Sequence, residues 1–77
     1  MISFRTERIL GKLLDYEFIS VATIMEIFDK DEYLPHNRSD AFTELKILVE
    51  GKFVKKIKQG LYKTDVEQIK KALGDLK

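Results

Sequence analysis

The side chains best suited to chemistry in this chain are a group of closely spaced lysines. They lie in the segment Phe53-Val-Lys-Lys-Ile-Lys-Gln-Gly-Leu-Tyr-Lys-Thr64, as Lys55, Lys56, Lys58 and Lys63. Each ammonium group carries a positive charge and donates hydrogen bonds, so several on one short segment suit the binding of phosphate groups. The alternative is that they solvate exposed strands and protect a sheet edge from aggregation.

The residue types after Gly51 predict that a β-hairpin, closed by a turn at Gln59-Gly60, positions these lysines. Gly60 would supply the positive φ angle that such a turn needs. Three apolar residues would share one side of the ribbon. They are Phe53, Ile57 and Tyr62.

A two-residue turn would place Ile57 opposite Tyr62 and Lys56 opposite Lys63. Like charges directly opposite each other destabilise a ribbon by a few tenths of a kcal/mol. The lysine pair would therefore gain from an anion bound between its members.

An amphipathic helix is predicted before the hairpin, capped by Asn37 or Ser39 and with Asp40 in its first turn. Its apolar residues recur at i, i+4 and i+7, with two more beside them. They are Ala41, Leu45 and Leu48, flanked by Phe42 and Val49. A helix joined to a basic two-stranded ribbon fits a nucleic-acid groove and the phosphates beside it, so the pattern favours nucleic-acid binding.

The first half of the chain predicts two more helices, separated by a brief extended piece at residues 17–19. The first runs from Phe4 to Asp15 with Ser3 as its cap, and its basic residues form a stripe interpreted as a solvated face. That stripe is Arg5, Arg8 and Lys12, opposite Ile9, Leu10, Leu13 and Leu14. Ser20 caps the second helix. Its apolar positions are Val21, Ile24, Met25 and Phe28.

A last helix is predicted to open with a capping box formed by Thr64 and Glu67. Its apolar residues form a seam with coiled-coil-like spacing. They are Val66, Ile69, Leu73 and Leu76. This seam could pair with a second copy of the chain or pack on the first helix.

Length and composition indicate one small α+β domain spanning residues 1–77, with 44% hydrophobic and 35% charged residues. The net charge is only +1, but residues 1–45 carry −4 and residues 46–77 carry +5, so one end is basic. No apolar run is long enough to span a bilayer, and the N-terminus lacks the apolar core of a signal peptide. The absence of cysteine fits a reducing, cytoplasmic setting.

Enzymatic, metal and cofactor sites are not expected from this sequence. His36 is the one histidine, and without cysteine it cannot complete a metal site or a nucleophilic dyad. The acidic residues Asp29, Asp31 and Glu32 lack the spacing and glycine of a calcium loop. A solvated turn explains them.

Taken together, the order helix, short strand, helix, loop, helix, strand, strand, helix resembles a winged helix-turn-helix domain. The motifs that carry the resemblance are Leu48-Val-Glu-Gly-Lys-Phe-Val54 and the wing Lys55-Lys-Ile-Lys-Gln-Gly-Leu-Tyr-Lys63. Similar patterns occur in many small bacterial, archaeal and phage regulators. The resemblance covers nearly the whole chain and implies a three-helix core, a two-stranded β-wing and a C-terminal helix.

The resemblance implies that the third helix enters the major groove of double-stranded DNA and that the wing lies on the backbone. Arg38 would then donate two hydrogen bonds to guanine, Thr43 would reach a phosphate or a thymine methyl, and Lys46 would suit a phosphate. The expected DNA-binding residues are Arg38, Ser39, Thr43, Lys46, Lys55, Lys56, Lys58 and Lys63. The expected function is that of a transcriptional regulator, acting as a homodimer through the C-terminal helix.

The alternative is a winged helix module that binds another protein within a larger complex. The near-neutral net charge, the loop before Asn37 and two carboxylates on the third helix favour it. Of these, Asp40 is expected to serve the helix terminus. Glu44 is expected to pair locally with a lysine, with a cytosine amino group as its other possible partner.

Overall fold

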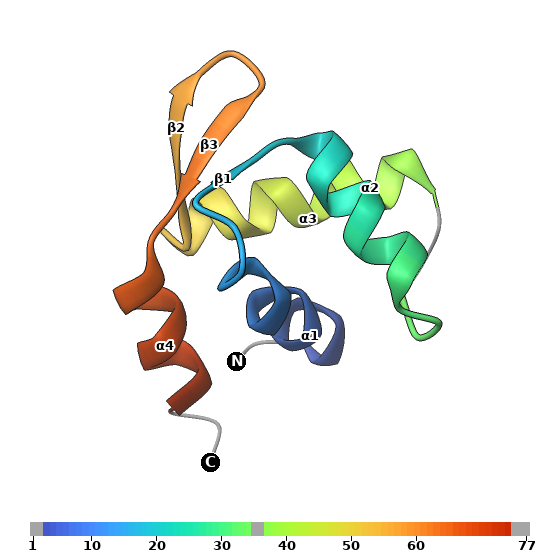
Figure 1. The fold of residues 1–77 in the computed structure, drawn as a ribbon, viewed down its shortest axis with the longest axis horizontal. Helices are drawn as coiled ribbons and strands as arrows, with labels where there is room; N and C mark the ends of the chain where they lie inside the picture. The colour runs from blue at the N-terminus through green and yellow to red at the C-terminus, as the bar shows by residue number, and fades with distance from the viewer. Residues whose placement is uncertain (1–2, 35–36, 75–77) are drawn as a thin grey trace.

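The computed structural model describes residues 3–34 and 37–74. Within these ranges the chain forms four helices and three strands, in the order predicted (Figure 1). They are α1 (Phe4–Leu13), β1 (Phe18–Ile19), α2 (Val21–Lys30), α3 (Arg38–Glu50), β2 (Val54–Lys58), β3 (Leu61–Thr64) and α4 (Val66–Gly74). The first helix ends two residues before the predicted Asp15. His36 and Leu76 lie outside the described residues.

The first three helices begin at side-chain caps. Ser3 and Ser20 cap α1 and α2 as predicted. Of the two caps considered for α3, Asn37 is the one used and Ser39 lies inside the helix. The Asn37 side chain accepts a hydrogen bond from the backbone N–H of Asp40 at 2.8 Å, which satisfies one of the helix's unpaired donors.

The helix α4 begins one residue later than its predicted capping box. Asp65 accepts a hydrogen bond of 3.0 Å from the backbone N–H three residues further on. The predicted Thr64–Glu67 capping box is therefore wrong. The Thr64 hydroxyl instead donates hydrogen bonds to the carbonyl oxygens of residues 16 and 17, at 2.6 and 3.1 Å. Thr64 therefore ties β3 to the segment before β1.

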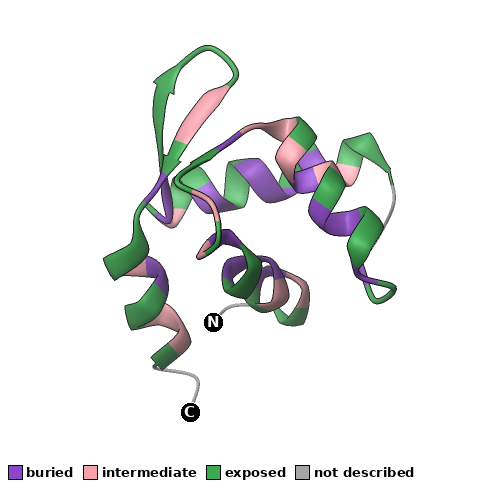
Figure 2. Ribbon diagram, viewed as in Figure 1, coloured by how far each residue is buried: buried purple, intermediate pink, exposed green. Residues whose placement is uncertain are grey.

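The apolar faces of the helices meet in one core, in which α4 packs against α1 (Figure 2). The fully buried aliphatic and aromatic side chains come from every helix and from β1. The largest of them are Ile9, Leu10, Leu13, Ile19, Ile24, Phe28, Leu48 and Ile69. The predicted apolar stripes agree with this core only in part. In α2, Ile27 is buried and Met25 only half-buried. Val66 of α4 and the flanking residues Phe42 and Val49 of α3 are exposed. Each full burial stabilises the fold by roughly 1.5–3 kcal/mol.

The hairpin belongs to a three-stranded antiparallel sheet in the order β1-β3-β2, so the predicted two-stranded ribbon gains a strand. Phe18 and Ile19 of β1 pair with Lys63 and Tyr62 of β3. Beyond β1, the hairpin of β2 and β3 projects from the helices (Figure 1). Its two-residue turn is confirmed, and Gly60 has a φ of 79°.

A bulge between Lys56 and Lys58 shifts the register of the hairpin by one residue. The predicted pairs Ile57–Tyr62 and Lys56–Lys63 are therefore wrong, because the extra residue in β2 moves each partner along. The pairs formed are Lys55 with Lys63, Lys56 with Tyr62 and Lys58 with Leu61. Ile57 has no opposite residue and is 49% exposed, so it does not join the apolar side of the sheet.

A buried carboxylate joins α3 to α1. Glu44 is 0% exposed, and its oxygens accept hydrogen bonds from Arg5 Nε at 2.7 Å and Thr6 Oγ1 at 3.1 Å. A buried carboxylate without such partners is strongly unfavourable. The expected contacts of Glu44 with a lysine or a base are therefore wrong, because it lies inside the protein.

A second ion pair joins α1 to the end of α2. Arg8 Nε lies 2.7 Å from Asp31 Oδ2, and the Asp31 side chain is only 3% exposed. The Arg8 guanidinium also lies over the rings of Phe4 and Tyr33, at 5.4 and 4.9 Å from their centroids. The predicted solvated face of α1 thus holds for Lys12 alone, and Asp31 is not part of a solvated turn.

Removing the Glu44 carboxylate should destabilise the fold. We expect Glu44→Ala to lower the free energy of unfolding by about 2–3 kcal/mol, less than for a fully buried ion pair because Arg5 retains contact with water. Urea denaturation measures this change. Glu50→Ala, which removes an exposed carboxylate from the same helix, is the control. Equal midpoints for the two variants would contradict the assigned role of Glu44.

The Arg8–Asp31 pair should make the free energy of unfolding depend on pH in the acid range. The hydrogen bond from Arg8, followed by that from the Tyr33 N–H, lowers the pKa of the Asp31 carboxyl. A lowered folded-state pKa gives stability that is present above the unfolded value and is lost as the pH falls below about 4. The urea midpoint of Asp31→Asn should therefore fall less between pH 5 and 3 than that of the unchanged chain, while Asp15→Asn should follow the unchanged chain. Parallel profiles for all three would refute this.

Candidate nucleic-acid interface

The outer face of α3 presents a polar row to solvent. Ser39, Thr43, Lys46 and Glu50 recur at i, i+4, i+7 and i+11, so they lie along one side of the helix. All four are exposed, whereas the opposite side is buried in the core. Three of the predicted DNA-binding residues therefore share this row, together with one carboxylate that was not assigned to the site.

Two of the predicted contacts on α3 are already engaged within the helix. Arg38 is its first residue, at the end away from the hairpin (Figure 1), and its guanidinium lies 5.7 Å from the centroid of the Phe42 ring. The Thr43 hydroxyl donates to the Ser39 carbonyl oxygen at 3.1 Å. Thr43 thus keeps its methyl group and an acceptor oxygen for a ligand, but its hydroxyl proton is already used.

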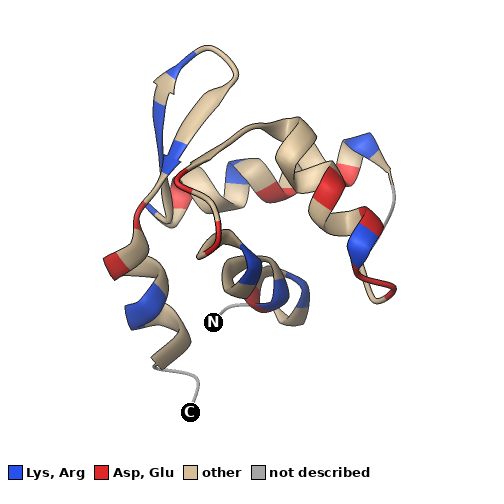
Figure 3. Ribbon diagram, in the orientation of Figure 1, with Lys and Arg blue, Asp and Glu red and all other residues tan. Residues whose placement is uncertain are grey.

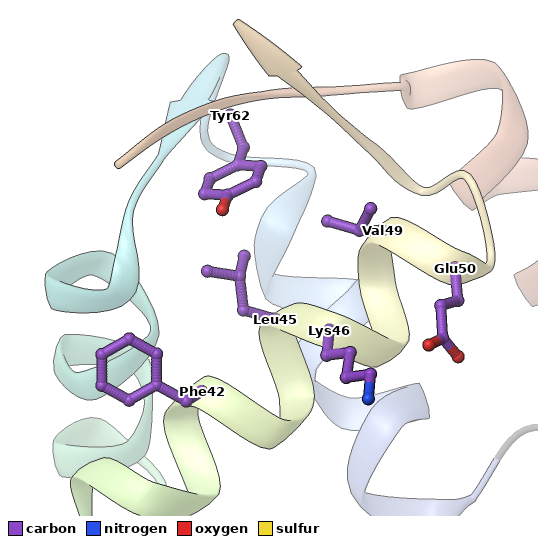
Figure 4. Close-up of a pocket in the computed structure, with 6 residues that line it drawn as sticks. All are labelled: Phe42, Leu45, Lys46, Val49, Glu50 and Tyr62. Atoms are coloured by element: carbon purple, nitrogen blue, oxygen red, sulfur yellow. The ribbon is translucent and has the colours of Figure 1, made fainter. Parts of the chain in front are cut away.

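The sheet register distributes the hairpin lysines over two faces. Directly opposite residues of an antiparallel pair point to the same side of a sheet, so Lys55 and Lys63 share one face with Phe18. Lys56 shares the other face with Tyr62. Figure 4 shows Tyr62 pointing toward α3. The register therefore places Lys56 on the sheet face turned toward α3 and Lys55 and Lys63 on the opposite face.

An open pocket of about 360 Å³ lies between α3 and β3 (Figure 4). Its lining is mainly apolar. The lining residues are Phe42, Leu45, Lys46, Val49, Glu50 and Tyr62. Phe42 is 51% exposed and Val49 is 38% exposed, although both are large and apolar. Sequence reasoning placed them beside the buried stripe and missed this surface. Their i, i+7 spacing, which puts them on one flank of the helix, is the signal that could have found it.

The charge on this part of the molecule is mostly positive and unneutralised. Residues 38–64 contain seven basic residues and three carboxylates. Two of the carboxylates contact Arg5 of α1, Glu44 at 2.7 Å and Asp40 at 3.6 Å, so Glu50 is the one that remains. None of the seven basic residues forms an ion pair within the described chain. Figure 3 shows basic positions on both strands of the hairpin and no acidic ones.

Comparisons of the chain with protein-family models, curated proteins and solved structures find no match. Residues 3–34 and 37–74 contain no cluster of three or more histidine, cysteine or acidic residues that could hold a metal ion. Nor does this part of the chain contain a helix long and apolar enough to cross a bilayer.

The facing lysines of the hairpin should repel each other measurably. We expect Lys63→Glu to raise the thermal stability by a few tenths of a kcal/mol, roughly the difference between a like and an unlike cross-strand pair. High salt should remove the gain, because both side chains are exposed. Lys58→Glu, which changes a lysine opposite Leu61, is the control. A gain of equal size in the control would contradict the Lys55–Lys63 register.

Proposed function

We propose that the chain is a winged helix domain that binds double-stranded DNA and acts as a sequence-specific transcriptional regulator. The third helix, α3, would enter the major groove, and the hairpin would lie against the sugar–phosphate backbone. The order of the elements supports this assignment, because a helix exposed along one side is followed directly by a projecting basic hairpin.

The observation that carries the proposal is the unequal neutralisation of the basic side chains. The arginines of α1 are used within the protein, Arg5 with Glu44 and Arg8 with Asp31. The lysines of α3 and the hairpin have no carboxylate partner in the described chain. A bound polyanion would neutralise these lysines, which the protein's own carboxylates do not. It would also release its own counterions on binding.

The lysines of α3 and the hairpin have different expected roles because they lie on different faces. Lys46 lines the pocket on α3, and Lys56 lies on the sheet face that is turned toward it. Both would reach phosphates on either side of a groove occupied by α3. Lys55 and Lys63 lie on the far face of the sheet and would contribute less.

A second candidate function is that of a protein-interaction module. The observation that favours it is the apolar pocket, whose exposed Phe42 and Val49 could receive an apolar side chain from a partner. Such an interface would respond little to salt, whereas phosphate contacts weaken steeply as salt rises. Salt dependence therefore separates the two candidates.

The homodimer through the C-terminal helix remains part of the proposal. Ile69 is already buried in the contact of α4 with α1, while Val66 stays 40% exposed. A second copy would therefore pack on the side of α4 that carries Val66. Sedimentation equilibrium of the chain and of Val66→Glu tests this, and a monomer at all concentrations would remove the dimer from the proposal.

The lysines on the two sheet faces should differ in their effect on DNA binding. We expect Lys46→Ala/Lys56→Ala to weaken binding to all duplex sequences alike and to reduce the slope of log K against log salt by about 2, since each phosphate contact contributes about 0.9 to that slope. Lys55→Ala/Lys63→Ala should change the slope by less. Fluorescence anisotropy with a labelled random duplex at several salt concentrations measures both.

The matched control is Lys70→Ala/Lys71→Ala, which removes two exposed lysines of α4. Its slope should equal that of the unchanged chain. If all three double variants weaken binding by the same amount, the binding depends on overall charge and not on the α3–hairpin surface. If the unchanged chain fails to bind any duplex at low salt, the DNA-binding proposal is refuted.

A further inference from the structure

The surface of α3 offers few hydrogen-bond donors for reading base edges. The Thr43 hydroxyl proton is donated to the Ser39 carbonyl oxygen, and Arg38 lies at the far end of the helix over Phe42. In the middle of the row, Lys46 is the one long side chain that carries a positive charge. Bidentate recognition of guanine or adenine, which needs an arginine, asparagine or glutamine facing the base, has no such residue there.

Apolar side chains are more prominent on the same surface. Phe42 is 51% exposed and Val49 is 38% exposed, two turns apart on the flank of α3 that faces β3. Both line the pocket together with Tyr62 (Figure 4). Water-exposed aromatic and aliphatic groups in this arrangement suit a small apolar group that enters the pocket or covers its rim.

The charges beside the pocket indicate what carries that apolar group. Lys46 is part of the lining, and Lys56 lies on the sheet face that is turned toward α3. Neither forms an ion pair with a carboxylate of the described chain, so the partner should be anionic around its apolar group. In the major groove, thymine presents a 5-methyl group between two phosphate backbones. Duplex DNA that contains thymine thus has both properties.

We infer that this chain selects its DNA mainly by apolar contact with thymine methyl groups, and that Phe42 and Val49 make the contact. The inference rests on the proposed function, since it names the feature of duplex DNA that the same surface reads. Lys46 and Lys56 hold the backbone and do not distinguish sequences. The chain therefore prefers a duplex with thymine methyl groups to a duplex that lacks them, even where the base pairs of the two duplexes present the same hydrogen-bonding groups.

Replacing thymine by uracil tests the inference, because uracil lacks only the methyl group. The probes are a labelled alternating adenine–thymine duplex and the same duplex with uracil in place of thymine. We expect the uracil duplex to bind about four-fold more weakly for each methyl group that the protein would otherwise cover, the factor that corresponds to one buried carbon group. In a guanine–cytosine duplex, 5-methylcytosine should strengthen binding relative to cytosine.

Two variants separate methyl contact from changes in duplex shape. Phe42→Ala removes an exposed side chain and should bring the thymine and uracil affinities together. Lys46→Ala should weaken binding to both duplexes while preserving their ratio. Thermal melting of each variant establishes that it is folded, and Val49→Ala provides a second apolar truncation should Phe42→Ala fail to fold.

The outcomes distinguish this inference from the function on which it rests. Salt-dependent binding with equal affinity for thymine and uracil duplexes would overturn methyl recognition and leave DNA binding in place. A thymine preference that persists in both Phe42→Ala and Val49→Ala would also overturn it, because the preference would then reflect the shape of the duplex. Failure to bind either duplex at low salt would refute the proposed function itself.

Discussion

The buried carboxylate of Glu44 is the constraint on which the arrangement of this protein depends. It lies on α3 with 0% exposure, and its partners Arg5 and Thr6 come from α1, almost forty residues earlier in the chain. Rotating α3 by one residue, about 100°, would move the carboxylate away from both partners and leave a charge buried without compensation. The pairing thereby determines which side of α3 meets solvent. Ser39 and Lys46 face outward for this reason.

The same internal pairing determines the charge of the surface. Arg5 pairs with Glu44 and Asp40, so of the three carboxylates in residues 38–64 only Glu50 has no ion pair within the described chain. One turn further along the same stripe of α1, Arg8 forms an ion pair with Asp31. The basic residues of α3 and the hairpin have no carboxylate partner in the described chain, as is also true of Lys12, Lys70 and Lys71 elsewhere on the surface. A chain of net charge +1 can therefore present a strongly basic surface, because its carboxylates neutralise the arginines of α1 and leave the lysines of α3 and the hairpin unpaired.

Local sequence was enough to predict the order of the elements, the caps of α1 and α2 and the two-residue turn, because these are set by neighbouring residues. The cap of α4 was not predicted, since the Thr64 hydroxyl bonds distant carbonyl oxygens and Asp65 takes its place. Local sequence could not predict contacts between distant residues or the bulge at Ile57, which depends on how β2 pairs. The bulge moved the predicted partners of Lys56 and Lys63 by one residue and left Lys58 opposite Leu61. The burial of Glu44 did have a signal in the sequence. It falls three residues after Ala41 and four before Leu48, on the apolar stripe itself. For the site, the helix and hairpin could be predicted, but the division of lysines between two sheet faces required the register.

The central claim is that duplex DNA binds to the surface formed by the outer row of α3 and the hairpin. The most direct test is to titrate isotope-labelled protein with a random DNA duplex and follow the backbone amide signals by NMR. The account predicts shifts concentrated in residues 38–64, with little change in α4 and around the Arg8–Asp31 pair. Shifts concentrated in α1 and α4, or spectra unchanged by DNA at low salt, would contradict it.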